Sequence, residues 1–372
     1  MKKYKNLKNS DEVITDDMKI ILHNCCDEFE DLAGSNILIT GGAGFLGYYF
    51  VHVINYWNSK VNASKKINLT VLDNFVRGVP EWLDSFKSDK NINFLKHNII
   101  EQLPKDIAKQ KYVIHAASIA SPIYYRKNPI STMDANVYGL RNILEYCIKN
   151  KSIKGVLNFS TSEIYGDPDP YNIPTNEEYR GNVSCTGPRA CYDESKRYGE
   201  TLCVNFYNEF KIPIKTVRPF NNYGPGLKIT DGRALPDFAK KVISGEDIVL
   251  FSNGMPTRTF CYITDAVSGY IKALVKGKSG EAYNIGIDKP EISIKQLAYK
   301  TIDIAKNLFD YTGQVIFSIS NDKEYLTDNP NRRCPDISKA KKDLNFDPYI
   351  DIDEGITKSL IWYQSNNKAE DL

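Results

Sequence analysis

Short runs of apolar, often β-branched residues recur along the chain from residue 36 onward, with longer segments between them. The runs are residues 36–40 (NILIT), 67–73 (INLTVLD), 112–118 (YVIHAAS), 155–162 (GVLNFSTS) and 213–220 (PIKTVRPF). Runs of this length predict buried strands, and the segments between them are long enough for crossover helices. Strands that alternate with helices predict an α/β fold with a doubly wound parallel sheet.

The first 34 residues have a different pattern, in which acidic and basic residues are mixed with polar ones. Within them, residues 10–34 (SDEVITDDMKIILHNCCDEFEDLAG) predict one capped helix that ends at Gly34. We therefore expect residues 1–34 to form a helical extension before the main fold.

Length and charge narrow the classes of function. A chain of 372 residues suits one two-domain enzyme or one large α/β unit. Its formal net charge is +2 and its basic residues are spread along the chain, which argues against a nucleic-acid partner. The sequence contains no run of about 18 apolar residues, and the polar sequence after the Met-Lys-Lys start has no signal-peptide core. We expect no membrane association and a cytoplasmic location.

The eight cysteines predict free thiols in a reducing compartment. Cys25 and Cys26 are adjacent, a spacing that suits neither an ordinary disulfide nor a zinc knuckle. Cys191, Cys203 and Cys261 lie in apolar segments, where a small hydrophobic side chain is the expected role. No structural metal is predicted.

A glycine-rich turn follows the first predicted strand. Gly41, Gly44 and Gly47 in GGAGFLG open a segment with helical spacing, YYFVHVINYW. Glycines at this place allow a tight turn, a close approach of a pyrophosphate, and close helix packing. The unpaired N–H groups of the following helix favour an anion. Asp73 ends the second strand, where a carboxylate accepts hydrogen bonds from ribose hydroxyls and repels a 2′-phosphate, so the predicted cofactor is NAD.

Tyr192 and Lys196 are four residues apart in CYDESK, within a predicted helix. Such a pair meets on one helix face whether or not it performs chemistry, and most such pairs are structural. Beside a dinucleotide site the pair has a specific use, because a nearby ammonium and a positive nicotinamide ring both favour the tyrosine phenolate. We interpret Tyr192 as a general base for a sugar hydroxyl, with Lys196 as its supporting cation.

Taken together, the glycine loop, the Tyr192/Lys196 pair, HAAS at 115–118 and FNNYGP at 220–225 resemble the extended short-chain dehydrogenase/reductase family. Within that family, a collinear set is most similar to the UDP-glucuronate decarboxylases (UDP-xylose synthases): STSEIYGDP, GNV, GPRACYDESKR, DGR and TRTFCYITDAVSGY. The resemblance covers nearly everything from Asn36 to about residue 365. It implies a homodimer formed through a four-helix bundle.

The resemblance also implies a division into domains. A Rossmann-type NAD-binding domain is expected over residues 35–225, with later segments near 259–290 returning to it. Residues 226–372 would mainly form a smaller α/β domain that binds the nucleotide sugar.

The triplet Thr161, Ser162 and Glu163 bears on the reaction. In the related 4,6-dehydratases an acidic residue stands at the position of Ser162, and in simple 4-epimerases a small residue stands at that of Glu163. The combination here indicates decarboxylation, in which a 4-keto uronate loses carbon dioxide because its electrons flow into the new carbonyl. Return of the hydride would then give UDP-xylose. Thr161 is expected to hydrogen-bond near the carbon 4 hydroxyl.

Further contacts are carried over from the resemblance. Arg189, Arg258, Tyr125 and Asn221 match substrate-binding positions, and Arg258 suits a diphosphate as well as a carboxylate, because guanidinium groups bind both. For Tyr125, packing within a loop is an equal alternative to substrate contact. Cofactor contacts are assigned to Phe45, Leu46, Asn74, Asn98 and Ala117, together with Gly41, Gly44, Gly47, Asp73, Tyr192 and Lys196. Asn98 stands where the family has an aspartate, and its carbonyl can still accept a hydrogen bond from adenine.

Other functions stay open at this point. The main alternative is another nucleotide-sugar 4-epimerase, 4,6-dehydratase or 4-dehydrogenase on the same fold, and GDP, CDP or dTDP could replace UDP. A non-catalytic dinucleotide sensor or scaffold is disfavoured, because it would not need Tyr192, Lys196 and Glu163 together.

Overall fold

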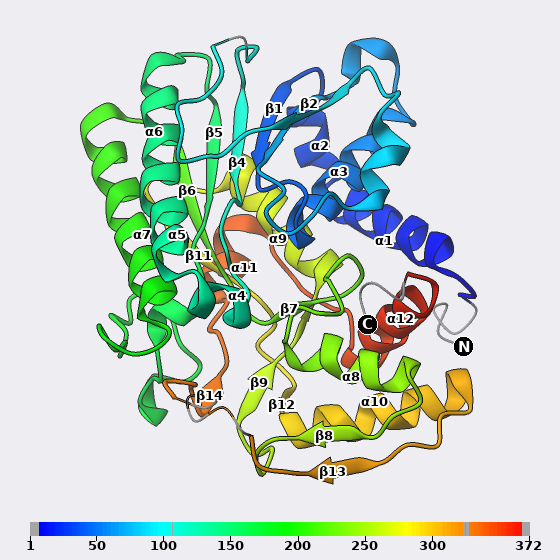
Figure 1. Cartoon of the computed structure of the whole chain (residues 1–372). Coiled ribbons are helices and arrows are strands. Elements are labelled where there is room, and N and C mark those ends of the chain that lie inside the picture. Colours follow the sequence, from blue (N-terminus) through cyan, green and yellow to red (C-terminus); the bar gives the residue numbers. More distant parts are fainter. Residues whose placement is uncertain (1–6, 106, 321, 323, 325–326, 367–372) are drawn as a thin grey trace.

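The structure is a computed structural model that describes residues 7–105, 107–320, 322, 324 and 327–366 (Figure 1). Its centre is a seven-stranded sheet in which every neighbouring pair is parallel, in the order β11-β6-β5-β4-β1-β2-β3. The strands are β1 (Asn36–Thr40), β2 (Asn68–Asp73), β3 (Ile92–Lys96), β4 (Tyr112–His115), β5 (Gly155–Phe159), β6 (Ile214–Pro219) and β11 (Ala282–Ile285). The predicted Rossmann-type parallel sheet is confirmed.

All five apolar runs of the sequence contain a strand of this sheet. The run at 112–118 supplies only four strand residues, because the chain turns out of the sheet after His115 and Ala117 passes close to Gly41. Strand β3 and strand β11 were not among the predicted runs. β11 joins the sheet from late in the chain by pairing with β6.

Alternate residues of each strand face opposite layers of helices, as the period of a strand requires. Ile37 and Ile39 belong to the larger apolar cluster and Leu38 to a second one on the other face. The first layer contains α3 (Phe45–Asn58) and α9 (Ile263–Lys276), with α11 (Ser338–Leu344) against α9. The second contains α5 (Pro129–Asp134), the π-helix η4 (Ala135–Gly139), α6 (Leu140–Lys149) and α7 (Ala190–Phe210), with α4 (Pro122–Lys127) beside α5 and α7.

A smaller group of elements lies below the carboxyl ends of the central strands (Figure 1). Its helices α8 (Ala234–Ile243), α10 (Ile294–Phe309) and α12 (Ile352–Ser365) pack against one another. Its strands form the pairs β10 (Cys261–Tyr262) with β7 (Asn222–Tyr223) and β13 (Val315–Phe317) with β8 (Ile248–Leu250), and the trio β12 (Glu291–Ser293), β9 (Thr257–Thr259) and β14 (Arg332–Arg333). Short 3₁₀ turns occur at η2 (Ala63–Lys65), η3 (Glu81–Phe86), η5 (Ser162–Tyr165) and η6 (Pro170–Asn172).

The N-terminal segment differs from the single helix predicted for residues 10–34. It forms two helices, α1 (Ser10–Asn24) and α2 (Cys26–Leu32), because Cys25 leaves the helical conformation at φ −127° and ψ 28°. The α1 cap is Asn9, whose side-chain oxygen accepts a hydrogen bond from the Glu12 N–H at 2.9 Å. Gly34, at φ +64°, lies two residues beyond the end of α2.

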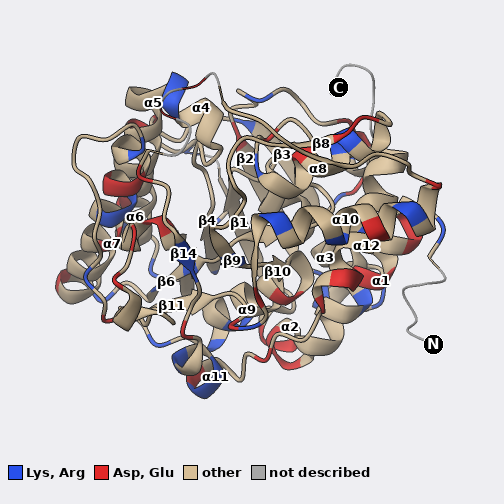
Figure 2. Ribbon diagram, turned by 90° about the horizontal axis from the view of Figure 1, so that it is seen from below, with Lys and Arg blue, Asp and Glu red and all other residues tan. Residues whose placement is uncertain are grey.

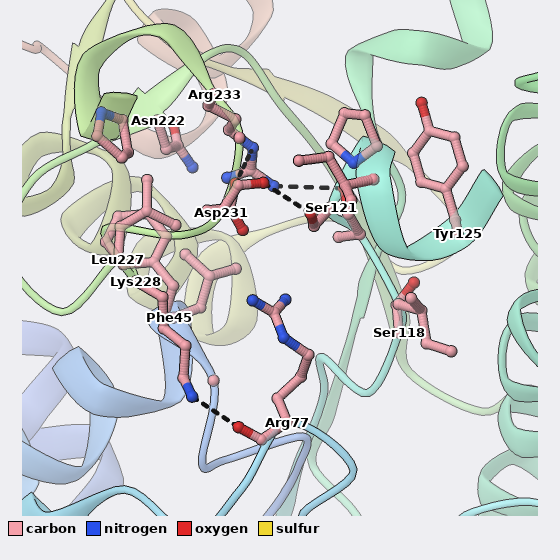
Figure 3. Close-up of a pocket in the computed structure, with 18 of the residues that line it drawn as sticks. Phe45, Arg77, Ser118, Ser121, Tyr125, Asn222, Leu227, Lys228, Asp231 and Arg233 are labelled. Carbon is pink, nitrogen blue, oxygen red and sulfur yellow. Dashed lines mark hydrogen bonds and ion pairs between the residues drawn. The ribbon is translucent and has the colours of Figure 1, made fainter. Parts of the chain in front are cut away.

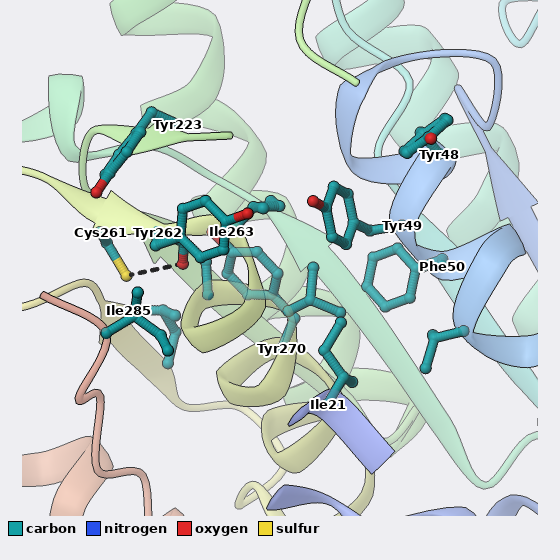
Figure 4. Packing of buried hydrophobic residues seen from close by; sticks show 14 of the residues in the cluster. Ile21, Tyr48, Tyr49, Phe50, Tyr223, Cys261, Tyr262, Ile263, Tyr270 and Ile285 are labelled. Atoms are coloured by element: carbon teal, nitrogen blue, oxygen red, sulfur yellow. Dashed lines mark hydrogen bonds between the residues drawn. The ribbon is translucent and has the colours of Figure 1, made fainter. Parts of the chain in front are cut away.

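Apolar side chains of α1 and α2 are part of the larger cluster. Ile21, Cys25 and Phe29 have no exposed surface, and the Phe29 ring centroid lies 5.4 Å from that of Trp57 in α3. Figure 4 shows Ile21 beside the aromatic side chains that α3 and α9 contribute. We therefore propose to assign α1 and α2 to the same folding unit as the central sheet, together with α9 and β11.

Charged residues of both signs are interspersed over the helices and loops (Figure 2). Among the described residues, no helix is both long and apolar enough to cross a membrane. All eight cysteines are free thiols. Within the same residues, no group of three or more His, Cys, Asp or Glu side chains could hold a metal ion.

Candidate active site

A cavity of about 1490 Å³ lies at the carboxyl ends of the central strands, between the sheet and the smaller group of elements. Its volume exceeds the range of about 300–1,000 Å³ that is usual for one small ligand, so it has space for more than one. The cavity lies beyond the paired strands β1 and β4, where the strand order reverses, and this is the switch point at which doubly wound sheets bind ligands. Every site residue predicted from the sequence lines it except Gly47.

The glycine turn joins β1 to α3 and leaves no room for side chains. Gly41 has φ +72°, and a Cβ there would lie 2.6 Å from the Ala117 Cα. Gly47 lies behind the cavity, where a Cβ would lie 2.2 Å from the carbonyl oxygen of Gly42, so it is needed for packing. Phe45 and Leu46 occupy the first turn of α3, whose N–H groups have no partner within the helix. These N–H groups suit an anion at the cavity wall.

The Asp73 carboxylate closes the glycine turn from the end of β2. Its two oxygens accept hydrogen bonds from the N–H groups of Ala43 at 3.0 Å and Phe75 at 2.8 Å. Burial raises the Asp73 pKa, and these hydrogen bonds oppose the shift. A carboxylate has about four acceptor sites, so Asp73 can still accept a hydrogen bond from a ligand hydroxyl. Asn74 and Asn98 line the same part of the cavity.

Tyr192 and Lys196 lie on one face of α7, and both are nearly buried. The Lys196 Nζ donates to the carbonyl oxygen of Phe159 at 2.8 Å and lies 5.8 Å from the centroid of the Tyr192 ring. Burial lowers the Lys196 pKa to about 8. Burial raises the Tyr192 pKa to about 12, and two neighbours oppose this, the hydrogen bond with Thr161 and the charge of Arg233.

Two neighbours fix the Tyr192 ring. Tyr125 of α4 stacks on it with 5.0 Å between the ring centroids and 6° between the planes. The Tyr125 hydroxyl is buried and has no partner among the described residues, so it is available to a ligand in the cavity. On the other side, Thr161 hydrogen-bonds Tyr192, and its Oγ1 also accepts from the Glu163 N–H at 3.2 Å.

Glu163 lies between two arginines that come from distant parts of the chain. Its Oε2 pairs with the Arg189 Nη2 at 2.6 Å and with the Arg333 Nη2. Burial alone would raise the Glu163 pKa, but the charges of Arg189 and Arg333 lower it to about 2. Ser162, next to it, is 4% exposed and faces the cavity. The carboxylate therefore stays ionised as long as both guanidinium groups face it.

Asp193 is a second buried carboxylate near this pair. Its Oδ2 lies 3.6 Å from the Arg189 Nε. Burial and the negative charge of Glu163 raise the Asp193 pKa, and Arg189 opposes the shift. Arg189 thus faces two carboxylates of unequal acidity.

Arg258 and Asn221 support the site from the side of the smaller group of elements. The Arg258 guanidinium donates to the carbonyl oxygens of Pro330 at 2.6 Å and Thr257 at 2.7 Å. The hydrogen bond to Pro330 holds the chain just before Arg333. Burial and the charge of Arg333 lower the Arg258 pKa to about 9. Asn221 donates to the Thr259 carbonyl at 2.9 Å and accepts from the Arg333 Nη1 at 3.3 Å.

Sequence reasoning missed two arginines of the site. Arg333 follows another arginine in a segment without a motif, so no local pattern marks it. Arg233 belongs to DGR, one of the segments that carry the family resemblance, but the segment by itself does not indicate what the arginine does. The role of Lys196 as the cation near Tyr192 stays a prediction, and the charge of Arg233 also lowers the Tyr192 pKa.

Figure 3 shows how three loops meet at the cavity. Arg233 pairs with Asp231 at 3.1 Å, and the Ser121 hydroxyl donates to the Asp231 carbonyl oxygen at 2.7 Å. The Lys228 Nζ donates to the Arg77 carbonyl oxygen at 2.6 Å. These contacts join the segments that follow β2, β4 and β7.

Comparison with known proteins matches most of this chain. Residues 37–286 match the NAD dependent epimerase/dehydratase family. The chain is 35% identical over 320 residues to UDP-glucuronic acid decarboxylase 3 of Arabidopsis thaliana, and the matched region covers 86% of each protein. It is 34% identical over 338 residues to UDP-glucuronic acid decarboxylase 1 of Xenopus tropicalis, which covers 89% of this chain and 74% of that protein.

Solved structures share the fold. The dTDP-glucose 4,6-dehydratase of Bacillus anthracis in complex with NAD has a TM-score of 0.75 at 22% identity, over 91% of this chain and 98% of that one. The UDP-glucose 4-epimerase of Thermotoga maritima with UDP-glucose has a TM-score of 0.74 at 24% identity, over 88% and 98%.

The glycine turn has no space for a side chain at position 41. A Gly41→Ala variant should lose at least tenfold in NAD affinity, about 1.4 kcal/mol, because its Cβ would push the Ala117 backbone away from the turn. The matched control is Gly245→Ala, since Gly245 has φ +69° and a Cβ there would meet nothing within 4 Å. Titration of both variants with NAD checks this. Equal affinity in the two variants would contradict the role of Gly41.

Proposed function

This chain belongs to the NAD dependent epimerase/dehydratase family, and on that premise we propose that it is an NAD-dependent decarboxylase that converts UDP-glucuronate to UDP-xylose. The family expected from the sequence is thereby confirmed. The observation that carries the proposed reaction is Glu163, which lies between Arg189 and Arg333 and directly follows Ser162 at the wall of the cavity.

The residues around the glycine turn fit a dinucleotide. The N–H groups at the start of α3 would face the pyrophosphate, and the Asp73 carboxylate would accept from the adenosine ribose. Asn98 would lie near the adenine, and Ala117 would lie against the dinucleotide backbone where Gly41 allows close approach. NAD, when bound, supplies a hydride acceptor for carbon 4 of the sugar and later returns the same hydride.

Tyr192 is the group that we assign to proton transfer at the carbon 4 hydroxyl. Its phenolate is disfavoured by burial, so it depends on nearby donors and positive charge. Thr161 supplies a hydrogen bond and Arg233 supplies a charge. After it has taken the proton, the Tyr192 hydroxyl can donate to the oxygen at carbon 4. This hydrogen bond would stabilise the enolate that forms when carbon dioxide leaves.

The uronate carboxylate would compete with Glu163 for its arginines. Planar guanidinium groups bind carboxylates through two parallel hydrogen bonds, and Arg189 and Arg333 both offer such a face. When either arginine turns to the substrate, Glu163 loses part of the attraction that holds its pKa low. Glu163 then becomes able to take up one proton from solvent and deliver it to carbon 5, where the new C–H bond replaces the bond to the departing carboxylate. Loss of carbon dioxide returns both arginines to Glu163.

Ser162 separates this proposal from the main alternative. A 4,6-dehydratase needs an acid to expel the hydroxyl at carbon 6, and an alkyl hydroxyl such as that of Ser162 is a poor proton donor at neutral pH. A 4-epimerase needs no charged groups near carbons 5 and 6, whereas three arginines and two carboxylates gather here. The proposed decarboxylation gives Arg189, Arg333 and Glu163 a direct role.

The reaction itself is tested by supplying UDP-glucuronate with NAD and measuring carbon dioxide and UDP-xylose. Wild-type protein should release both in equal amounts without consuming an external reductant. Tyr192→Phe should keep the fold and NAD affinity and lose at least a hundredfold in turnover, since a general base is worth about 10²–10⁴. A wild-type protein that only epimerises or dehydrates a neutral nucleotide hexose would refute the decarboxylase proposal.

Glu163→Gln tests the proton-delivering carboxylate. We expect at least about a hundredfold slower carbon dioxide release, with NAD affinity within a few-fold, because the amide keeps the shape and loses the charge. The matched control is Glu200→Gln, because Glu200 pairs with Arg218 at 2.6 Å, is as buried as Glu163, and does not line the cavity. Similar losses of turnover in both variants would show that Glu163 acts only through stability.

A homodimer is also part of the proposal. Ile130, Met133, Tyr138, Val204 and Phe210 lie on α5, η4 and α7 and are 42–67% exposed. A second copy that packs the same helices against them would form a two-fold four-helix bundle. Sedimentation should give twice the chain mass of 42.2 kDa, and a Tyr138→Glu variant should shift it toward the monomer. A monomeric wild type would refute the dimer.

The cytoplasmic location stays a prediction that cell fractionation would check.

A further inference from the structure

A fully buried lysine joins the N-terminal helix to the last helix of the described chain. The Lys358 side chain of α12 has no exposed surface, and its Nζ lies 2.8 Å from the Asp16 Oδ2 and 3.1 Å from the Asp17 Oδ1 of α1. Glu354, one turn earlier in α12, lies 3.3 Å away. Although burial disfavours the ammonium, the Asp17 and Asp16 carboxylates raise the Lys358 pKa.

Asp17 extends this cluster to two further elements. Its Oδ2 accepts hydrogen bonds from the hydroxyls of Tyr49 in α3 at 2.7 Å and Tyr262 in β10 at 2.8 Å. Figure 4 shows these two tyrosines with their hydroxyls turned toward each other. Buried charges are costly unless their partners are fixed, and removing one partner destabilises strongly. The cluster therefore holds α12 in one place relative to α1, α3 and β10.

The last turn of α12 reaches the active-site cavity. Trp362, Tyr363, Ser365 and Asn366 line it. Tyr363 is 2% exposed, and its hydroxyl donates to the carbonyl oxygen of Leu227 at 2.8 Å. Leu227 belongs to residues 224–233, the segment that also carries Asp231 and Arg233 (Figure 3). Tyr363, Asp231 and Arg233 all line the same cavity, and the charges of Asp231 and Arg233 both act on the Tyr363 pKa.

Arg233 brings this segment to the cavity that Tyr192 also lines. Its side chain is held by Asp231 at 3.1 Å and by the Ala120 carbonyl at 3.4 Å. Several polar or charged groups act on Tyr192. They are Thr161, which is the N-cap of η5, together with Glu163, Asp193, the stacked Tyr125, Lys196 and Arg233. Of these, Arg233 alone lies on the segment that Tyr363 holds.

We propose that Tyr363 is a positioning residue for the reaction. Supported by the buried Lys358 cluster, Tyr363 fixes residues 224–233, and the Arg233 guanidinium therefore stays beside Tyr192. The N-terminal helix α1 then contributes to catalysis from outside the cavity, because it supplies the carboxylates that hold α12. This inference rests on the proposed role of Tyr192 as a general base.

The test is the pH dependence of kcat/KM in Tyr363→Phe, which removes one hydroxyl and keeps the ring. If Arg233 moves away, the Tyr192 pKa rises. Activity that requires the phenolate then appears at higher pH, so the ascending limb should shift upward by at least about half a pH unit. Asp17→Asn should shift it in the same direction. The control is Asp353→Asn, on the same helix as Tyr363, which removes a half-exposed pair with Lys300 of α10 and should leave the limb in place.

A merely structural role would give a different result. Tyr363→Phe would then lower the melting temperature or the rate at every pH and leave the limb unmoved, and this would overturn the proposal. A shift in Tyr363→Phe without one in Asp17→Asn would overturn the part assigned to α1. A readout without substrate separates this inference from the proposed function. The tyrosinate absorbance is titrated against pH with NAD bound, and the part that Tyr192→Phe removes is assigned to Tyr192. The midpoint of that part is then compared between the wild-type and Tyr363→Phe backgrounds. An unchanged midpoint there overturns the positioning role even if no nucleotide uronate is decarboxylated.

Discussion

Glu163 accepts from two guanidinium groups that belong to distant parts of the chain, and the shape of the active site depends on this pairing. Arg189 begins α7 beside the central sheet, whereas Arg333 lies in β14 of the smaller group of elements. A buried carboxylate with one or two fixed cations is tolerated, and one without them is not. The two halves of the cavity must therefore meet at Glu163 in the ligand-free protein. In the proposed reaction, a substrate carboxylate would take over one of the arginines without creating an unpaired charge.

The same arrangement recurs away from the site, with a different consequence. Lys358 joins α12 to α1 through Asp16 and Asp17, and Arg218 of β6 joins Glu200 of α7 through two hydrogen bonds. Each pair fixes two elements at one distance and orientation, because ionic hydrogen bonds between buried groups are strong and directional. Of these three ionic groups, the one at Glu163 lines the cavity. The others hold the elements that place it.

Parallel strands bring the remaining site residues together. The segments that follow β1, β2, β4, β5 and β6 all emerge at the same edge of the sheet, so the glycine turn, Asp73, Ala117, Thr161 and Asn221 share one cavity. α7 then crosses this edge with Tyr192 and Lys196 on the face turned to the cavity. The burial that results raises the pKa of Tyr192 and lowers that of Lys196. Both shifts oppose the charged forms, which makes the charge of Arg233 important.

The sequence alone determined the features that depend on local patterns. Apolar runs marked five of the seven central strands, the glycine spacing marked the turn that Ala117 closes, and the spacing of Tyr192 and Lys196 placed them on one helix face. It did not reveal β11, the break at Cys25, or the roles open to Arg233 and Arg333. β11 is a short run whose partner β6 lies far away in the chain. Cys25 continues the four-residue spacing of the buried Ile21 and Phe29, so the helical pattern gives no sign of a break. Arg333 and Arg233 are ordinary arginines until folding brings them to Glu163 and Tyr192. Only the tertiary structure decides such contacts, because the strength of a charge interaction depends on distance and burial, and neither is encoded in local sequence.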